Sequence, residues 1–307
     1  MARTERLTAV EGGLAAEVAA LWDRAEAADG VAPVSEAFAL ALGPSRDGVV
    51  HVLRRGDDER VVGYAQVSSA GTVHAVAELV VDPADRRTGH GRALLDAALA
   101  HGARSAWAHG DLPAARALAE STGLERTRSL HVMSRPLTAE DDTDPTLPDG
   151  YAVRTFEPGR DDEAWVRLNA AAFADHPEQG RLTVDDLHER MAQPWFDPAG
   201  FLLVERDGRL VAFHWTKIEP EDRASHAPGM TGARHGSGEV YAVGVAPEEQ
   251  GRGLGGPLTE LGVAHLAGQG LAEVELYVDG DNVRARRTYE RLGFTDAAVD
   301  AQYSLPG

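Results

Sequence analysis

The sequence predicts a two-domain protein of the α/β class, and three observations support this prediction. The chain has 307 residues, about twice the length of an ordinary domain of ~150 residues. Residues 135–150 hold three prolines and a run of acids without an apolar period, which is typical of an exposed linker. The two halves repeat one order of elements. We therefore expect domains at 1–137 and 151–307, joined by a linker at 138–150.

The repeated part of each half begins with a predicted β-hairpin. In the first half, the segments 49–55 and 61–67 are rich in Val and flank a polar turn. In the second half, residues 201–218 show the same pattern, with Asp207 and Gly208 at the turn. Both patterns predict antiparallel strand pairs.

Each hairpin is followed by a further apolar strand, a turn rich in glycine and arginine, and an amphipathic helix. Alignment of Arg86 with Gln250 also superposes Gly89 on Gly253 without a gap. A repeat of half the chain is too long for a solenoid, whose units have about 20–45 residues. The repeat therefore predicts a duplicated domain.

The composition excludes several functional classes. A net charge of −19 leaves no broad basic face for nucleic acid, and the absence of cysteine excludes disulfides and thiolate sites. No uncharged apolar run is long enough for a membrane-spanning helix. Residues 1–20 are acidic and rich in alanine, and they lack the basic flank and apolar core of a secretory signal. We expect a cytoplasmic protein without a membrane partner.

The glycine-rich turns at 86–91 and 250–255 are candidate pyrophosphate sites. A turn between a strand and a helix start presents unpaired backbone N–H groups and the positive end of the helix dipole. Neither copy has the Gly-Lys-Ser/Thr of a P-loop, and neither has the third glycine of a dinucleotide-binding turn. One copy alone fits an ordinary turn equally well, but two copies in register favour binding.

Residues 239–294 resemble motifs A and B of the GNAT family of N-acetyltransferases. The resemblance lies in VGVAPEEQGRGLG at 243–255 and in LYVDGDNVRARRTYERLGF at 276–294, and a weaker form recurs in the first half. It implies a mixed, mostly antiparallel sheet flanked by helices in each domain. It also implies acetyl-CoA as co-substrate, entering where two central strands splay apart.

The resemblance assigns cofactor contacts to three segments of the second half: the strand before the loop, the loop itself and the start of the last helix. These residues are Val243, Gly244, Val245, Gln250, Gly251, Arg252, Gly253, Leu254, Gly255, Gly256, Asn282, Val283, Arg284, Ala285, Arg286 and Arg287. The corresponding residues of the first half are Leu79, Val80, Val81, Arg86, Arg87, Thr88, Gly89, His90, Gly91 and Arg92.

Acetyl transfer to an amine requires a base for the amine and an acid for the leaving thiolate. Glu239 lies four residues before Val243, so alternation along a strand predicts that both side chains share a face, and Glu239 is the candidate base. The resemblance implies that Tyr289 is the acid. A solvated glutamate at a strand end and a tyrosine packed on an amphipathic helix are the plain alternatives.

The first half lacks both candidate groups. With the glycine loops in register, Glu239 corresponds to Ala75, and with the Gly-Asp pairs in register, Tyr289 corresponds to Ala119. The first copy therefore keeps the phosphate loop without the base or the acid. We expect chemistry in the second domain alone.

The acceptor is predicted from a further resemblance, to tandem-domain GNAT enzymes that acetylate the cysteinyl amine of a cysteinyl-glucosaminyl-inositol. HPEQG at 176–180 and FHWTK at 213–217 support it. The implied acceptor contacts are Glu36, Glu178, Lys217, Glu239 and Tyr277. Carboxylates, a lysine and a tyrosine suit the hydroxyls and ammonium of such a molecule.

Other interpretations remain open at this point. Glu36 also fits an ordinary helix start, Glu178 a solvated loop, and Lys217 an ion pair with Glu219 or Glu221. A second hypothesis is an enzyme that acetylates another amine, such as an aminoglycoside or a protein N-terminus. A third is an acetyl-CoA sensor that catalyses no reaction. The histidines lack the ligand spacing of a metal site, so we expect no metal, and analogy within the family favours a monomer.

Overall fold

The structure is a computed structural model that describes residues 2–174, 176, 179–220, 222 and 235–306. It divides into an N-terminal unit, Met1–Leu130 with Ala298–Gly307, and a C-terminal unit, His131–Ala297. This division differs from the expected domains at 1–137 and 151–307. Two strands, β6 (Glu125–Pro136) and β12 (Thr295–Ser304), each begin in one unit and end in the other.

The N-terminal unit contains a mixed sheet in the order β1-β2-β3-β4-β5-β12-β6. Strands β1 to β4 pair antiparallel, β4 pairs parallel with β5, and β12 pairs antiparallel with β5. The bounds are β1 Arg3–Leu7, β2 Val50–Arg55, β3 Val61–Ser68, β4 Val76–Val81 and β5 Ser105–Ala108. The pairing of β2 with β3 confirms the first predicted hairpin.

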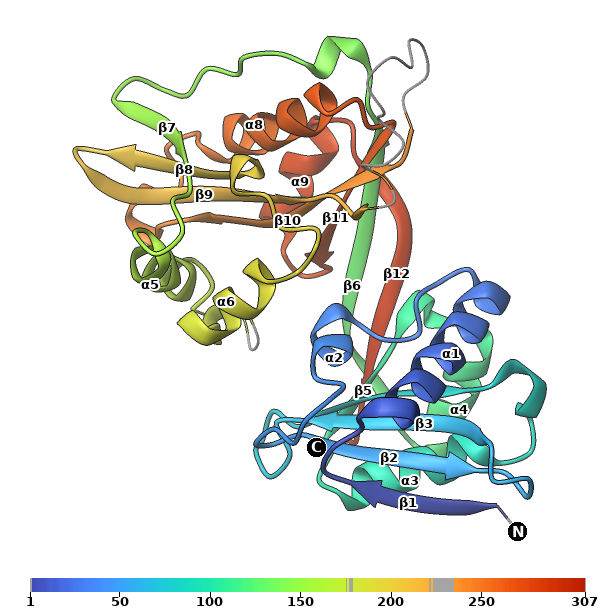
Figure 1. Ribbon diagram of the computed structural model, residues 1–307. Coiled ribbons are helices and arrows are strands. Elements are labelled where there is room, and N and C mark those ends of the chain that lie inside the picture. Colours follow the sequence, from blue (N-terminus) through green and yellow to red (C-terminus); the bar gives the residue numbers. More distant parts are fainter. Residues whose placement is uncertain (1, 175, 177–178, 221, 223–234, 307) are drawn as a thin grey trace. The chain divides into compact units, whose positions relative to one another are not determined.

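Two helices cover each face of this sheet (Figure 1). Helices α1 (Gly12–Asp29) and α2 (Glu36–Leu40) lie on one face, where α1 packs against Leu53 and Tyr64. Helices α3 (His90–Ala100) and α4 (Pro113–Thr122) lie on the other face. Each face has its own buried apolar cluster, as expected for a sheet between two helical layers.

The C-terminal unit repeats this design, with strands in the order β6-β11-β10-β9-β8-β7. The bounds are β7 Tyr151–Thr155, β8 Phe201–Arg206, β9 Arg209–Lys217, β10 Ser237–Val245 and β11 Glu273–Asp279. Only β10 with β11 is parallel among the pairs whose register is resolved in the described ranges. The β8–β9 turn has positive φ at Asp207 and Gly208, 51° and 72°, which confirms the second predicted hairpin.

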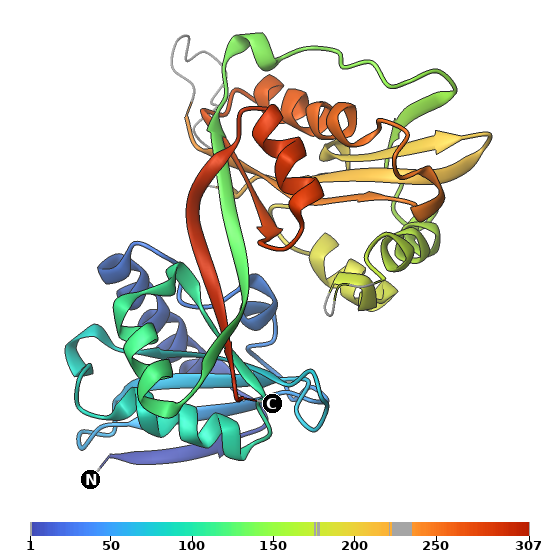
Figure 2. The same cartoon turned by 180° about the vertical axis from the view of Figure 1, so that it is seen from behind.

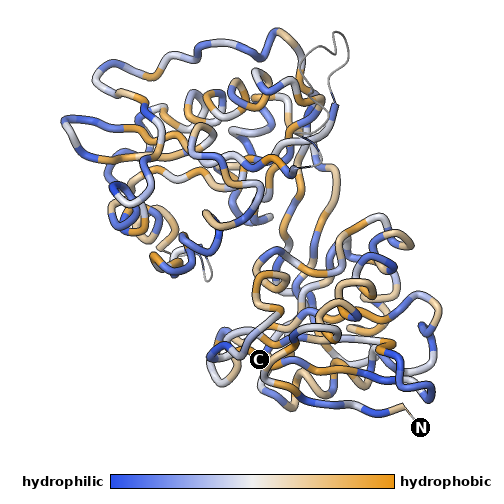
Figure 3. Tube along the Cα trace, viewed as in Figure 1, coloured by the Kyte–Doolittle hydropathy of each residue, from blue (hydrophilic) through white to orange (hydrophobic). Residues whose placement is uncertain are grey.

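Helices α5 (Asp162–Ala172) and α6 (Val184–Met191) cover one face of the C-terminal sheet, and α8 (Gly255–Gly268) and α9 (Val283–Arg291) cover the other (Figure 2). The α5/α6 face is packed with aromatic rings, and the α8/α9 face with aliphatic side chains. Figure 3 shows the hydrophobic residues concentrated in the strands and core-facing helices of each unit. The mixed, mostly antiparallel sheet flanked by helices is thus confirmed for both units.

Six short 3₁₀ helices complete the elements of the described ranges: Pro83–Asp85, His109–Asp111, Ala139–Asp141, Gln179–Arg181, Pro198–Gly200 and Pro247–Glu249. Within those ranges, none of the helices combines the length and the hydropathy needed to cross a lipid bilayer.

Candidate active site

A β-bulge in β10 decides which face each candidate side chain presents. The register with β9 shifts between Val240 and Ala242, so Tyr241 is an extra residue. Val240 packs on the α8/α9 face and Ala242 on the α5/α6 face, although they are two positions apart. Val243 also packs on the α8/α9 face, whereas Glu239, next to Val240, points to the α5/α6 face. The expectation that Glu239 and Val243 share a face is therefore wrong.

Glu239 lies beside a lysine on the neighbouring strand. Lys217 is its Cα partner on β9, and Lys217 Nζ lies 4.0 Å from Glu239 Oε2 and 2.7 Å from Glu219 Oε1. The ammonium also lies over the rings of Trp195 and Tyr241, 5.3 and 5.8 Å from their centroids. The Glu239 side chain is 20% exposed, so its carboxylate is largely shielded from water.

Tyr289 lies on the opposite side of the sheet from Glu239. It packs against the α8/α9 cluster and meets the Phe294 ring edge-on, with centroids 5.9 Å apart. Burial raises the pKa of Tyr289 to about 12, so its hydroxyl stays protonated at neutral pH. The two candidate side chains, the Glu239 carboxylate and the protonated Tyr289 hydroxyl, thus lie on opposite faces of the C-terminal sheet.

The other predicted acceptor residues fall in different places. Tyr277 on β11 is 46% exposed and alternates with buried Leu276 and Val278, so it faces the same side as Glu239. Glu36 is the first residue of α2 in the N-terminal unit and is half-buried. Glu178 lies outside the described residues. The structure thus brings Lys217, Glu239 and Tyr277 to one face of one sheet.

The predicted phosphate loop of the C-terminal unit leads directly into α8. Gly251 and Gly253 have φ of 82° and 83°, and a Cβ on either would meet nothing within 4 Å. Backbone conformation, not lack of space, therefore requires these glycines. Within the described ranges, the N–H groups from Gly251 to Leu254 donate to no protein acceptor. They are available for the oxygens of a pyrophosphate.

The start of α9 lies close to this loop. The Asn282 side chain caps the helix by accepting from Ala285 N at 3.1 Å, and Arg284 Nη1 lies 3.4 Å from Gln250 Oε1. Arg286 is held instead by Asp296, with 2.9 Å between Nη2 and Oδ2. Among the predicted arginines of this segment, Arg284 therefore reaches the loop, whereas Arg286 fastens the helix.

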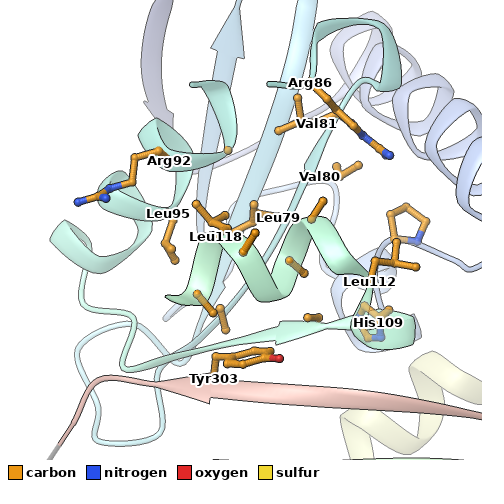
Figure 4. Close-up of a pocket in the computed structure, with 18 of the residues that line it drawn as sticks. Leu79, Val80, Val81, Arg86, Arg92, Leu95, His109, Leu112, Leu118 and Tyr303 are labelled. Atoms are coloured by element: carbon orange, nitrogen blue, oxygen red, sulfur yellow. The ribbon is translucent and has the colours of Figure 1, made fainter. Parts of the chain in front are cut away.

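In the N-terminal unit, a pocket of about 540 Å³ opens between β4, β5, α3 and α4. All predicted cofactor residues of this half line it except Thr88 and His90. In Figure 4, Leu79, Leu95 and Leu118 form an apolar wall, with Arg86 and Tyr303 at opposite ends. Arg86 is oriented by two hydrogen bonds of 2.7 Å to the Asp29 carboxylate. The sequence did not indicate Tyr303, because it lies on β12, outside the repeat.

A buried row of three charges adjoins this pocket. His109 Nδ1 lies 3.0 Å from Asp300 Oδ2, and His109 Nε2 lies 3.3 Å from Glu78 Oε1. Burial lowers the His109 pKa, but the hydrogen bond to Asp300 and the contact with the Glu78 carboxylate outweigh it and raise the pKa to about 10. The His109 imidazolium therefore links β12, which carries Asp300, to β4, which carries Glu78, within the N-terminal sheet. The sequence did not indicate His109, Asp300 or Glu78, because no local pattern marks an ion pair between residues as far apart in the chain as His109 and Asp300.

Strand β4, which occupies the place of β10 in the N-terminal sheet, has no such bulge. Strand β4 pairs with β3 in continuous register, so the structural counterpart of Glu239 is Val76, and the predicted counterpart, Ala75, is displaced by one position. Ala119 is buried on α4 and lines the pocket. The N-terminal unit thus has no carboxylate at the place of Glu239 and no hydroxyl at the place of Tyr289.

The model of the acetyltransferase (GNAT) family matches the chain twice, at residues 18–124 and 165–294. The chain belongs to this family. Two GNAT domains, each with a strand, a glycine-rich loop and a helix, make the protein an acetyltransferase.

Curated relatives within the GNAT family are similar over nearly the whole chain. A mycothiol acetyltransferase of Streptomyces coelicolor is 51% identical, covering 93% of this chain and 90% of its own. A mycothiol acetyltransferase of Thermomonospora curvata is 50% identical, covering 94% and 93%. Within the GNAT family, the chain is therefore similar over nearly its whole length to mycothiol acetyltransferases.

Solved GNAT structures share the fold. A tandem GNAT protein from the clavulanic acid biosynthesis pathway aligns over the full length of both chains, with a TM-score of 0.70 and 19% identity. A GCN5-related N-acetyltransferase from Sphaerobacter thermophilus aligns over 99% of this chain and 96% of its own, with a TM-score of 0.66 and 23% identity. These likenesses concern the fold alone.

Proposed function

We propose that this GNAT enzyme transfers the acetyl group of acetyl-CoA to the cysteinyl amine of 1D-myo-inositol 2-(L-cysteinylamino)-2-deoxy-α-D-glucopyranoside, which yields mycothiol. The observation that carries the proposal is the 51% identity to a mycothiol acetyltransferase over 93% of the chain. The face formed by Lys217, Glu239 and Tyr277 supports it, because these groups suit a polar acceptor with hydroxyls and an ammonium.

The acetyl-CoA site that we propose for the C-terminal unit uses backbone groups. The unpaired N–H groups from Gly251 to Leu254 would bind the pyrophosphate, with Arg252 and Arg284 nearby. The backbone of Val243 to Val245 would hold the pantetheine arm and orient the thioester carbonyl beside β10. We propose no metal for this reaction.

The proposed chemistry divides between the two faces of β10. Glu239 accepts a proton from the acceptor ammonium, so that the nitrogen lone pair attacks the thioester carbon and forms the amide bond. The carbon–sulfur bond breaks, and Tyr289 donates its proton to the departing thiolate. The nitrogen loses its second proton to solvent, from which the Tyr289 phenolate is reprotonated. The raised pKa of Tyr289 keeps that proton in place until the sulfur develops charge.

For the N-terminal unit we propose acetyl-CoA binding without transfer. The 540 Å³ pocket and the left-handed Gly89 support binding, whereas Val76 and Ala119 stand where a base and an acid would be needed. The cytoplasmic location and the monomeric state expected from the sequence remain part of the proposal. Size-exclusion chromatography tests the latter.

The decisive experiment measures acetyl transfer to three acceptors. We expect product from the cysteinyl acceptor and none from glucosaminyl-inositol without cysteine or from an aminoglycoside panel. Glu239→Gln should lower kcat about 10²-fold or more, without weakening acetyl-CoA binding. Turnover of an aminoglycoside in preference would contradict the acceptor, and acetyl-CoA binding without turnover of any amine would favour a sensor.

A further inference from the structure

A second carboxylate, Glu275, lies next to Glu239 in the C-terminal unit. The parallel pairing of β10 with β11 makes Glu239 and Glu275 direct Cα partners. Val274 and Leu276, on either side of Glu275, are buried in the α8/α9 cluster, so Glu275 points to the opposite face, as Glu239 does. Neighbouring strands lie about 4.8 Å apart, which places the two side chains side by side.

The lysine of this face lies on the far side of Glu239. Across β9, β10 and β11 the partners run Lys217, Glu239, Glu275. The Lys217 ammonium lies 2.7 Å from Glu219 Oε1. Within the described ranges, the Glu275 carboxylate accepts no hydrogen bond from the protein. Its ionised form is thus half-buried without a paired cation.

The surroundings of Glu275 disfavour its charge in the unliganded protein. Burial raises the pKa of Glu275, the nearby carboxylates of Glu273 and Asp222 raise it further, and Lys217 opposes them only in part. Carboxylates held close together are stabilised by a cation placed between them. An amine acceptor arrives as an ammonium ion and provides that cation.

We infer that Glu275 binds the ammonium group of the acceptor and holds it against Glu239. This inference rests on the proposed acetylation of an amine. Glu239 then removes one proton, and Glu275 keeps a hydrogen bond to an N–H that stays on the nitrogen while the lone pair turns to the thioester. Glu275 is therefore a specificity residue for the cationic end of the acceptor, and Glu239 remains the base.

The test is Glu275→Gln, with Glu273→Gln as matched control. Glu273 lies on the same strand and the same face as Glu275, but it is the first residue of β11 and is exposed. A lost hydrogen bond to a charged group predicts that Glu275→Gln raises the KM for the cysteinyl acceptor about tenfold or more. The KM for acetyl-CoA should not change, kcat should change less than the acceptor KM, and Glu273→Gln should resemble the wild type.

A deamino analogue of the acceptor shows whether the ammonium is what Glu275 recognises. This analogue has hydrogen in place of the amino group, and its inhibition constant should be the same for wild type and Glu275→Gln. Equal weakening of the analogue and the amine would overturn the inference, as would an acceptor KM unaffected by Glu275→Gln. Failure of the wild type to acetylate the cysteinyl acceptor would instead refute the proposed function.

Thermal stability distinguishes this role from a structural one. The folded state binds a proton at Glu275 more tightly than the unfolded chain does, so ionisation of Glu275 lowers stability as pH rises through its pKa. Glu275→Gln should therefore melt at a higher temperature than the wild type at pH 7, and the gain should shrink toward pH 4.5. A lower melting temperature at pH 7 would mean that Glu275 supports the fold, and would overturn the inference.

Discussion

The two glycine loops allow one perturbation to be made twice in the same chain. Gly89 and Gly253 occupy the same position of the repeat and have φ of 91° and 83°. A Cβ on either would meet nothing within 4 Å. Gly89→Ala and Gly253→Ala therefore introduce the same backbone strain without a steric clash, one in each unit.

The strain sets the size of the effect. An L-residue in the left-handed region costs about 1–2 kcal/mol relative to glycine. If the loop must adopt this conformation to bind the pyrophosphate, the cost weakens acetyl-CoA binding at the altered site by roughly 5- to 30-fold. We expect Gly253→Ala to raise the KM for acetyl-CoA by this factor. Gly89→Ala should leave KM and kcat near the wild-type values.

Two assays separate binding from turnover. Transfer is followed by chromatography of released CoA, because the thiol of the proposed acceptor would itself react with thiol reagents. Calorimetric titration with acetyl-CoA counts the sites, and we expect two in the wild type, with one weakened in each variant. Similar melting temperatures for the two variants would show that the strain is matched.

One result would refute the reasoning. If Gly89→Ala slowed turnover as much as Gly253→Ala did, the N-terminal loop would take part in catalysis, and the assignment of chemistry to the C-terminal unit would fail. A wild-type titration with a single site would refute only the binding role of the N-terminal pocket.

Three further predictions concern single side chains. Tyr289→Phe keeps the packed ring but removes the proton, so kcat should fall by about 10²-fold with the KM for acetyl-CoA unchanged; an unaffected kcat would leave Tyr289 as a packing residue only. His109→Gln leaves two buried carboxylates without their cation and should lower the unfolding free energy by about 3–5 kcal/mol in denaturant titrations. Because the His109 pKa is raised to about 10, its contribution is complete below pH 6.5 and declines as pH rises toward 10, a decline that the variant should lack. Burial lowers the pKa of His214 to about 4, so the C-terminal unit should lose stability as pH falls from 6.5 toward 4; tryptophan fluorescence during acid titration measures this, and a flat profile would contradict it.

Much of the fold could be predicted from short local sequence patterns. Asp207 and Gly208 predicted their hairpin because only a turn with two positive φ angles favours that pair. The spacing of Gly251 and Gly253 predicted the loop before α8 for a similar reason. These features depend on backbone conformation at a few neighbouring residues, which the sequence specifies directly.

Features set by pairing over long distances could not be predicted. The bulge at Tyr241 adds one residue to β10 without any local mark, and it reverses the face of Glu239 relative to Val243. The salt bridge between His109 and Asp300 joins residues 191 positions apart. A pattern read along one strand shows alternation, but only the partner strand fixes the register.

The place of β12 constrains the order in which the protein can fold during synthesis. Residues 298–304 leave the ribosome after the whole C-terminal unit, yet residues 301–304 pair with β5, and Asp300 and Tyr303 bind side chains of the N-terminal unit. Until then, the first 130 residues expose one edge of β5 and leave His109 without one of its two carboxylates. The domain translated first is thus the one completed last, and a fragment ending at residue 137 would lack a strand of its own sheet.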